Sequence, residues 1–243
     1  SSYIISAYFK SQGLDAIHAD ARTLITTDQV HGKASVNYAL TNQKLLEFNG
    51  ANKNAIVVMG GFIASSSEGV ATTLGRGGSD FTAAIVAAAL DASLLEIYTD
   101  VSGMFTANPK LVKQAYPIEK ISYQEAMELS HFGAKVLYPP TVQPVLDLNI
   151  PIHIKNTLKP EDTGTIISKT NESILGQSPI KGISHIDSVA LLTLEGSGMV
   201  GIPGFSKRLF ETLAQEKINV ILITQASSEH SICLGIPVTF LDR

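Results

Sequence analysis

The sequence predicts an α/β fold in which a largely parallel sheet is covered by helices on both faces, as a three-layer αβα sandwich, followed by a smaller βαββ unit. Over residues 1–168, short β-branched runs alternate with helical patterns, which is typical of parallel sheets because each crossover takes up a helix. Residues 169–180 are polar and rich in turn formers. Beyond them the order becomes strand, helix, strand, strand, the beginning of a ferredoxin-like unit.

We therefore predict a first domain at 1–168, a linker at 169–180 and a second domain at 181–243. The second domain stops before the last helix and strand of a complete ferredoxin-like unit. The start is equally abrupt, because Ser1 and Ser2 open an apolar periodic run without an initiator Met or the charged start of a signal peptide. We expect a chain that is cut at both ends and begins inside a domain.

Apolar spacing predicts the individual elements of both domains. The predicted helices are 2–10, 38–48, 80–90, about 122–132 and 203–217. The predicted strands are 14–19, 55–59, 70–74, 94–99, 150–155, 165–167, 188–195, 219–225 and 231–236.

Three of these elements are especially informative. Residues 55–59 form a continuous apolar run, the pattern of a strand buried on both faces. Residues 80–90 are apolar on every side, so this helix must be buried, and Ser79 is its expected N-cap. Ser122 followed three residues later by Glu125 is a capping box that starts a helix.

Composition excludes several classes of protein. Of 243 residues, 18 are Lys or Arg and 22 are Asp or Glu, so the net charge of −4 disfavours nucleic acid or a membrane surface as the main partner. The single Cys233 excludes a disulfide framework and fits a reducing, cytoplasmic location. The six His residues show no metal-binding spacing and no Ser lies in a GxSxG motif, so we predict neither a metal site nor triad chemistry.

The strongest chemical signal is the glycine loop, residues 74–80 (LGRGGSD), which runs into the apolar helix. Three glycines let the backbone approach a ligand, and the helix N-terminus offers N–H groups and partial positive charge to an anion. Arg76 adds a planar donor suited to a carboxylate or phosphate. The loop matches neither a P-loop nor a dinucleotide motif. An alternative is a plain turn in which Arg76 and Asp80 pair with each other or cap the helix.

Two further positions suggest ligand contacts. Asp100 follows a predicted strand at its carboxyl end, where open α/β sheets bind ligands, although it would also suit the start of a turn. Lys135 can reach a phosphate or simply cap the end of a helix as a cation.

Several motifs taken together resemble the aspartokinases, members of the amino acid kinase family. The matching segments are 60–62, 74–80, 98–101, 122–129 and 132–137. Residues 222–229 are similar to the first regulatory ACT domain of these enzymes, in particular of the threonine-sensitive bifunctional aspartokinase–homoserine dehydrogenases. Residues 154–157 also resemble these bifunctional enzymes, but more weakly.

The resemblance implies transfer of the ATP γ-phosphoryl group to the side-chain carboxylate of L-aspartate. It implies that Arg76 and Asp80 are catalytic, that Phe62 and Ser79 complete the substrate pocket, and that Mg2+ accompanies ATP. The residues that the resemblance places around the nucleotide are Thr99, Asp100, Phe105, Lys110 and Lys135.

Two departures from the family pattern matter. Asn108 and Lys110 stand where the family has Asp and Arg, which removes a negative charge and a bidentate fork and predicts altered nucleotide contacts. The family's Lys-Phe-Gly-Gly-Thr segment and a Gly-Glu pair are absent from this sequence. We therefore expect little or no kinase activity from this chain alone.

Two other functions remain open. One is an amino-acid-sensing and dimerising module, with threonine favoured over lysine as effector and a homodimer or larger homo-oligomer as the assembly. Its candidate effector contacts are Asn219, Val220, Ile221 and Gln225, of which Val220 and Ile221 also suit an ordinary core strand. The other is a different amino acid kinase, acting on glutamate or N-acetylglutamate, which the glycine loop and the ACT-like tail disfavour.

Overall fold

The structure is a computed structural model that describes residues 1–131, 136–138, 140, 142–169, 180–199, 201–225 and 230–241. The chain divides into two compact units, Ser1–Ser184 and His185–Arg243. The predicted linker at 169–180 lies almost entirely outside the described residues. Lys181 belongs to the first unit, where its ammonium lies 3.0 Å from a carboxylate oxygen of Glu125.

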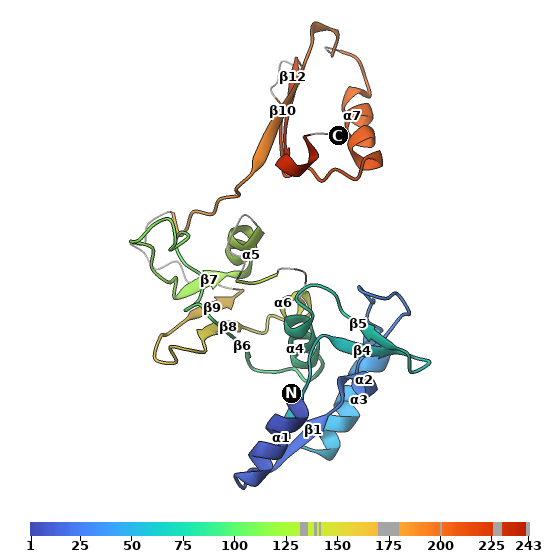
Figure 1. The fold of residues 1–243 in the computed structure, drawn as a ribbon, viewed down its shortest axis with the longest axis vertical. Coiled ribbons are helices and arrows are strands. Elements are labelled where there is room, and N and C mark those ends of the chain that lie inside the picture. The colour runs from blue at the N-terminus through green and yellow to red at the C-terminus, as the bar shows by residue number, and fades with distance from the viewer. Residues whose placement is uncertain are drawn as a thin grey trace. The chain divides into compact units, whose positions relative to one another are not determined.

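The amino-terminal part of the first unit contains two small sheets (Figure 1). Strand β1 pairs in parallel with β3, and β4 lies between β2, which is parallel to it, and β5, which is antiparallel. The elements in chain order are α1 (Ser2–Ser11), β1 (Ala16–Ala19), α2 (Ala21–Leu24), β2 (Thr26–Thr27), α3 (Tyr38–Ala51), β3 (Ile56–Met59), β4 (Ile63–Ser66) and β5 (Ala71–Thr73).

The rest of the first unit is built on a four-stranded mixed sheet in the order β6-β8-β9-β7. Strands β6 and β8 are parallel, β8 and β9 antiparallel, and β9 and β7 parallel. The elements are α4 (Gly78–Ala89), β6 (Leu95–Thr99), β7 (Lys120–Ser122), α5 (Tyr123–His131), α6 (Gln143–Asp147), β8 (Ile152–Asn156) and β9 (Thr165–Ser168).

Helix α4 belongs to two hydrophobic cores at once. Its Ile85 is buried with Leu24, Leu45 and other residues around α2 and α3. Its Ala84 and Ala87 are buried in a second cluster formed largely by the four-stranded sheet, α5 and α6. The helix packs against α3, α6 and β6. An apolar surface on every side is therefore required, as the sequence predicts for this helix.

The capping box at the start of α5 is formed as predicted. The Ser122 N–H and hydroxyl both donate to Glu125 Oε2, at 2.9 and 2.7 Å, and the Glu125 N–H donates back to Ser122 Oγ at 3.2 Å. Partial burial alone would raise the pKa of Glu125, but the hydrogen bonds from Ser122 and the nearby Lys181 ammonium lower it. Glu125 thus joins the start of α5 to residues near 181.

The structure contains short elements that the sequence prediction lacks, among them α2, β2, β4 and β7. It also differs from the prediction in three further respects. Ile56 and Val57 of β3 are 45% and 40% exposed, so this strand is not buried on both faces. The reason is that β3 pairs only with β1 among the described strands. The predicted single sheet is also divided into separate sheets. Finally, α4 begins at Gly78 with Gly77 as its N-cap, which places Ser79 inside the first turn.

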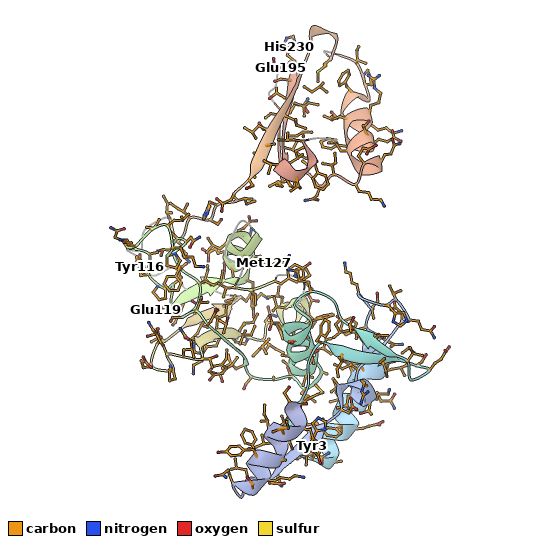
Figure 2. The ribbon with its side chains drawn as sticks, viewed as in Figure 1. Tyr3, Tyr116, Glu119, Met127, Glu195 and His230 are labelled. Atoms are coloured by element: carbon orange, nitrogen blue, oxygen red, sulfur yellow. The ribbon has the colours of Figure 1, made fainter. Side chains whose placement is uncertain are left out.

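The second unit has the predicted βαββ order. Its antiparallel sheet has the order β10-β12-β11, and α7 packs on one face through a core that includes Met199, Leu213, Ile232 and Leu234. Figure 2 shows Glu195 and His230 at the same end of the β10–β12 pair, where the Gly196 N–H donates to the carbonyl oxygen of His230 at 3.1 Å. The elements are β10 (Val189–Glu195), a 3₁₀ turn (Ser197–Met199), α7 (Phe205–Gln215), β11 (Leu222–Gln225), β12 (Ser231–Pro237) and a second 3₁₀ turn (Val238–Phe240).

The double burial of α4 predicts a large effect of truncating Ile85, which is 1% exposed. Ile85→Ala should lower the free energy of unfolding by about 2–5 kcal/mol, because it removes buried methylene contacts and leaves a cavity. The matched control is Ile4→Ala, at a helical position in α1 that is 71% exposed, where the expected change is below about 0.5 kcal/mol. Urea unfolding followed by circular dichroism measures both, and equal losses would contradict the burial of Ile85 in the core around α2 and α3.

Candidate active site

The glycine loop approaches α4 through two left-handed residues, Gly75 (φ 77°) and Gly77 (φ 67°). Residues with a side chain rarely adopt this conformation, so the sequence requires glycine there. The carbonyl oxygen of Gly77 accepts the first intrahelical bond, from the Phe81 N–H at 3.0 Å. The N–H groups of Ser79 and Asp80 therefore have no acceptor within the helix, and they form an electropositive helix start.

Phe62 packs directly against this helix start. A Cβ atom on Gly78 would lie 2.6 Å from Cδ2 of Phe62, and one on Gly61 would lie 2.9 Å from Cα of Ser79, so neither position has room for a side chain. The Phe62 N–H donates to Thr82 Oγ1 at 3.0 Å, and this hydroxyl donates to the Gly78 carbonyl at 2.8 Å. The structure thus brings Phe62 and the glycine loop together.

Phe62 itself has a left-handed backbone (φ 75°), which is rare for a bulky residue. Such strain persists only where the surroundings fix it, and it concentrates at functional sites. Phe62 as a whole is 41% exposed, so part of its surface is accessible to a ligand. Thr82, which holds this arrangement, has no functional signal in the sequence because an isolated Thr in an apolar helix looks like ordinary core.

Arg76 and Asp80 do not pair with each other. The Arg76 guanidinium lies over the ring of Tyr138, with its carbon 5.0 Å from the ring centre. Within the described part of the chain, the Asp80 side chain has no hydrogen bond or ion pair. Burial of this half-buried carboxyl raises the pKa of Asp80. The site therefore presents the exposed guanidinium of Arg76 and the half-buried carboxyl of Asp80, whose ionised form a positively charged ligand group would stabilise.

The four described candidates for nucleotide binding are Thr99, the last residue of β6, and Asp100, Phe105 and Lys110, which lie on the connection from β6 to β7. The Thr99 hydroxyl donates to Asp100 Oδ1 at 3.3 Å, and Phe105 forms an isolated bridge with Pro117. The Lys110 N–H donates to Asn108 Oδ1 at 3.0 Å, so Asn108 supports the local turn through its side-chain oxygen. Figure 2 marks Tyr116 and Glu119 on the same connection. Lys135 lies outside the described residues.

A buried polar cluster that sequence reasoning missed holds this connection in place. Asn156, at the end of β8, donates to Ser102 Oγ at 2.9 Å, and the Ser102 hydroxyl donates to Asp162. The Met104 N–H donates to Thr165 Oγ1 at 2.8 Å. The only hint in the sequence is the family-like segment 154–157, since partners more than 50 positions apart leave no local pattern.

The second unit contains a cavity of about 300 Å³ beside the start of α7. It is lined by residues 201–206 together with Met199, Gln225 and Ile232. Of the predicted effector contacts, Gln225 lines this cavity, whereas Val220 packs against the core of the unit. Asn219 is exposed, and the Ile221 N–H donates to the Gly235 carbonyl at 2.7 Å.

No group of three or more His, Cys, Asp or Glu side chains is arranged to hold a metal ion in the described part of the chain. Similarly, none of the described helices is long and apolar enough to cross a membrane.

Comparison with known proteins identifies the class of protein. The amino acid kinase family model matches residues 1–156, and an ACT domain model matches residues 192–242. The chain therefore belongs to the amino acid kinase family, as its motifs predict.

Several relatives and solved structures are aspartokinases. Bifunctional aspartokinase/homoserine dehydrogenase 1, chloroplastic, from Arabidopsis thaliana is 38% identical over 241 residues, which cover 98% of this chain and 26% of that protein. E. coli aspartokinase III in complex with lysine and aspartate has a similar fold, with a TM-score of 0.77 and 32% identity, covering 98% of this chain and 53% of that chain. Its complex with aspartate and ADP gives a TM-score of 0.75 at 32% identity, covering 97% and 52%.

The chain thus spans about a quarter of the first relative and about half of aspartokinase III. The motif resemblance to aspartokinases is confirmed.

The raised pKa of Asp80 predicts a pH-dependent penalty on stability. The folded state holds the proton of Asp80 more tightly than the unfolded state does. Protonated Asp80 therefore contributes to the stability of the fold below about pH 4, and this contribution is lost as pH rises through the folded pKa. Asp80→Asn removes the buried charge and should be as stable as the wild type or more stable at pH 8, with the difference shrinking towards pH 4.

Urea unfolding at pH 4, 6 and 8 measures this difference. Asp15→Asn, at an exposed position, serves as the charge-matched control. A loss of stability in Asp80→Asn at pH 8 would show that the carboxylate has a stabilising partner.

Proposed function

We propose that this chain is part of an aspartate kinase. Such an enzyme transfers the γ-phosphoryl group of ATP to the side-chain carboxylate of L-aspartate and gives 4-phospho-L-aspartate. The observation that carries the proposal is the helix start of α4, where two left-handed glycines flank the exposed Arg76 and Asp80 lies in the first turn. The E. coli aspartokinase III structure with aspartate and ADP, which has a similar fold, supports this assignment.

The acceptor needs no general base. A side-chain carboxyl with an ordinary pKa of about 3.9 is already ionised at neutral pH, so its oxygen can attack phosphorus directly. A new bond joins this oxygen to the γ-phosphorus. The bond between the γ-phosphorus and the oxygen that bridges it to the β-phosphate breaks, and ADP leaves. Positioning and charge stabilisation must therefore supply the catalysis.

The residues of the glycine loop suit the amino-acid substrate. Arg76 would hold the α-carboxylate through its planar fork, and the N–H groups of Ser79 and Asp80, which have no acceptor within helix α4, would add donors. The Asp80 carboxyl, with its raised pKa and no partner among the described residues, would gain one in the substrate ammonium. Phe62 would form the pocket wall with the accessible part of its surface.

The connection from β6 to β7 would hold the nucleotide. Thr99 and Asp100 offer polar contacts, Phe105 an aromatic surface and Lys110 a cation for the phosphates, with Lys135 as a further cation. Mg2+ would arrive with the nucleotide, bound to phosphate oxygens and neutralising their charge. The turn supported by Asn108 indicates that the change from Asp preserves the local geometry, because an amide oxygen accepts the same backbone bond.

A second proposed function is binding of an amino-acid effector in the cavity of the second unit. The cavity lies at the start of α7, where helix N–H groups favour a carboxylate, and the Gln225 side chain supplies an amide. Threonine is the favoured effector over lysine. We also propose a homodimer or larger homo-oligomer, since the sheet edges of this unit need cover.

Replacing Arg76 by Lys keeps the charge but removes the bidentate fork. We expect L-aspartate to bind about 10- to 100-fold more weakly, because a hydrogen bond to a charged group contributes about 1.5–3 kcal/mol. Calorimetry measures the affinity, and a coupled ADP-release assay on the intact enzyme measures kcat/KM. Arg22→Lys is the matched control, because Arg22 pairs with Asp20 away from the glycine loop. Equal kinetics for Arg76→Lys and the wild type would refute the substrate role.

Gln225→Ala should weaken threonine binding about 5- to 10-fold, the loss expected for one hydrogen bond of about 1–1.4 kcal/mol. Isothermal calorimetry with threonine and with lysine measures this, and Gln215→Ala, on the exposed surface of α7, is the matched control. If neither amino acid gives heat with the wild type, the effector proposal is wrong.

A further inference from the structure

Arg76 lies between two left-handed glycines in the glycine loop and is exposed. No ion pair to its guanidinium is found among the described residues. A free arginine side chain carries about 2 kcal/mol of rotamer entropy, which must be lost whenever it binds a ligand in one geometry. A contact that orders Arg76 before the ligand arrives would reduce that cost.

Tyr138 provides such a contact. The guanidinium carbon lies 5.0 Å from the ring centre, inside the distance of about 6 Å at which a cation is attracted to an aromatic face. The ring is mounted on a fixed part of the fold, because its neighbour Leu137 is 4% exposed and Val142 is 1% exposed in the core beside α4. Tyr138 itself is 36% exposed, so it borders solvent where a ligand would enter.

The geometry of the contact matters for binding. An ion pair with a carboxylate of the protein would engage the N–H groups of the guanidinium, whereas attraction to an aromatic ring uses no hydrogen-bond acceptor. The contact with Tyr138 therefore orders Arg76 without engaging it in an ion pair that a substrate carboxylate would have to replace.

We propose that Tyr138 is a positioning residue that orients Arg76 through its ring face, and so sets the affinity of the site for the carboxylate of the amino-acid substrate. The substrate part of this inference rests on the proposed aspartate kinase function. It predicts that an aromatic residue is needed at position 138 and that the phenol hydroxyl is not.

The first test needs no substrate. The chain contains no Trp, so Tyr138→Trp introduces a single tryptophan at the stacking position. Its fluorescence intensity should change when Arg76→Ala is added, because the cation is then removed from the ring face. Tyr8→Trp, on exposed α1, is the control and should not respond to Arg76→Ala. An unchanged spectrum for position 138 would overturn the inference.

The second test measures L-aspartate binding by calorimetry. Tyr138→Leu should weaken binding about 2- to 5-fold, the range expected for an exposed cation–π contact, while Tyr138→Phe and Tyr138→Trp keep wild-type affinity. On the intact enzyme, KM should rise with kcat unchanged. Tyr8→Leu is the matched control. The inference would be overturned if Tyr138→Phe weakened L-aspartate binding as much as Tyr138→Leu does. It would also be overturned if Tyr138→Leu bound L-aspartate with wild-type affinity.

The two tests separate this inference from the proposed function. If the wild type does not bind L-aspartate at all, the proposed function fails, and the substrate part of the inference fails with it. The fluorescence test still decides whether the ring holds Arg76. If Tyr138→Leu does not fold, as judged by circular dichroism, the comparison of Phe and Trp with the wild type decides the second test.

Discussion

The burial of α4 from two sides is the constraint on which the rest of the first unit depends. Ile85 belongs to the core around α2 and α3, and Ala84 and Ala87 belong to the core of the four-stranded sheet, so one helix joins the two halves of the unit. The small alanine side chains allow close approach, and beyond Thr82 the helix carries no polar side chain whose burial would cost desolvation free energy. Because the glycine loop leads directly into this helix, the packing of α4 also sets the position of the candidate site.

The same packing explains how a flexible sequence becomes an ordered site. The loop itself supplies conformational freedom, while Phe62, Thr82 and the close contact at Gly78 fix its end against α4. Asp80 is left half-buried with its pKa raised, and Arg76 is left exposed against an aromatic ring. Buried polar bonds from Asn156 and Thr165 hold the connection after β6 in a comparable way. In both places, groups that would contact ligands are carried by backbone that packing has made rigid.

Much of this arrangement could be predicted from local patterns. The all-apolar α4, the capping box at Ser122 and Glu125, and the βαββ order of the second unit each depend on neighbours in sequence, and the structure contains them. One error concerns a relation between distant segments, and the other concerns the backbone conformation of a single loop residue. Exposure of Ile56 and Val57 depends on how many strands pair with β3, and the start of α4 at Gly78 depends on the left-handed turn at Gly77. Neither is visible in the spacing of apolar residues.

The sequence by itself determined the family, through motifs that resemble the aspartokinases. It also determined most of the elements and the residue types of the glycine loop, because these follow from periodicity, capping and backbone freedom over a few residues. Only the tertiary structure decided that Arg76 faces Tyr138 rather than Asp80, that Gln225 lines a cavity while Val220 fills the core, and that Ser102 meets Asn156. The physical reason is that side-chain contacts between distant segments are set by packing. A side chain's partner therefore depends on which surfaces the fold buries together.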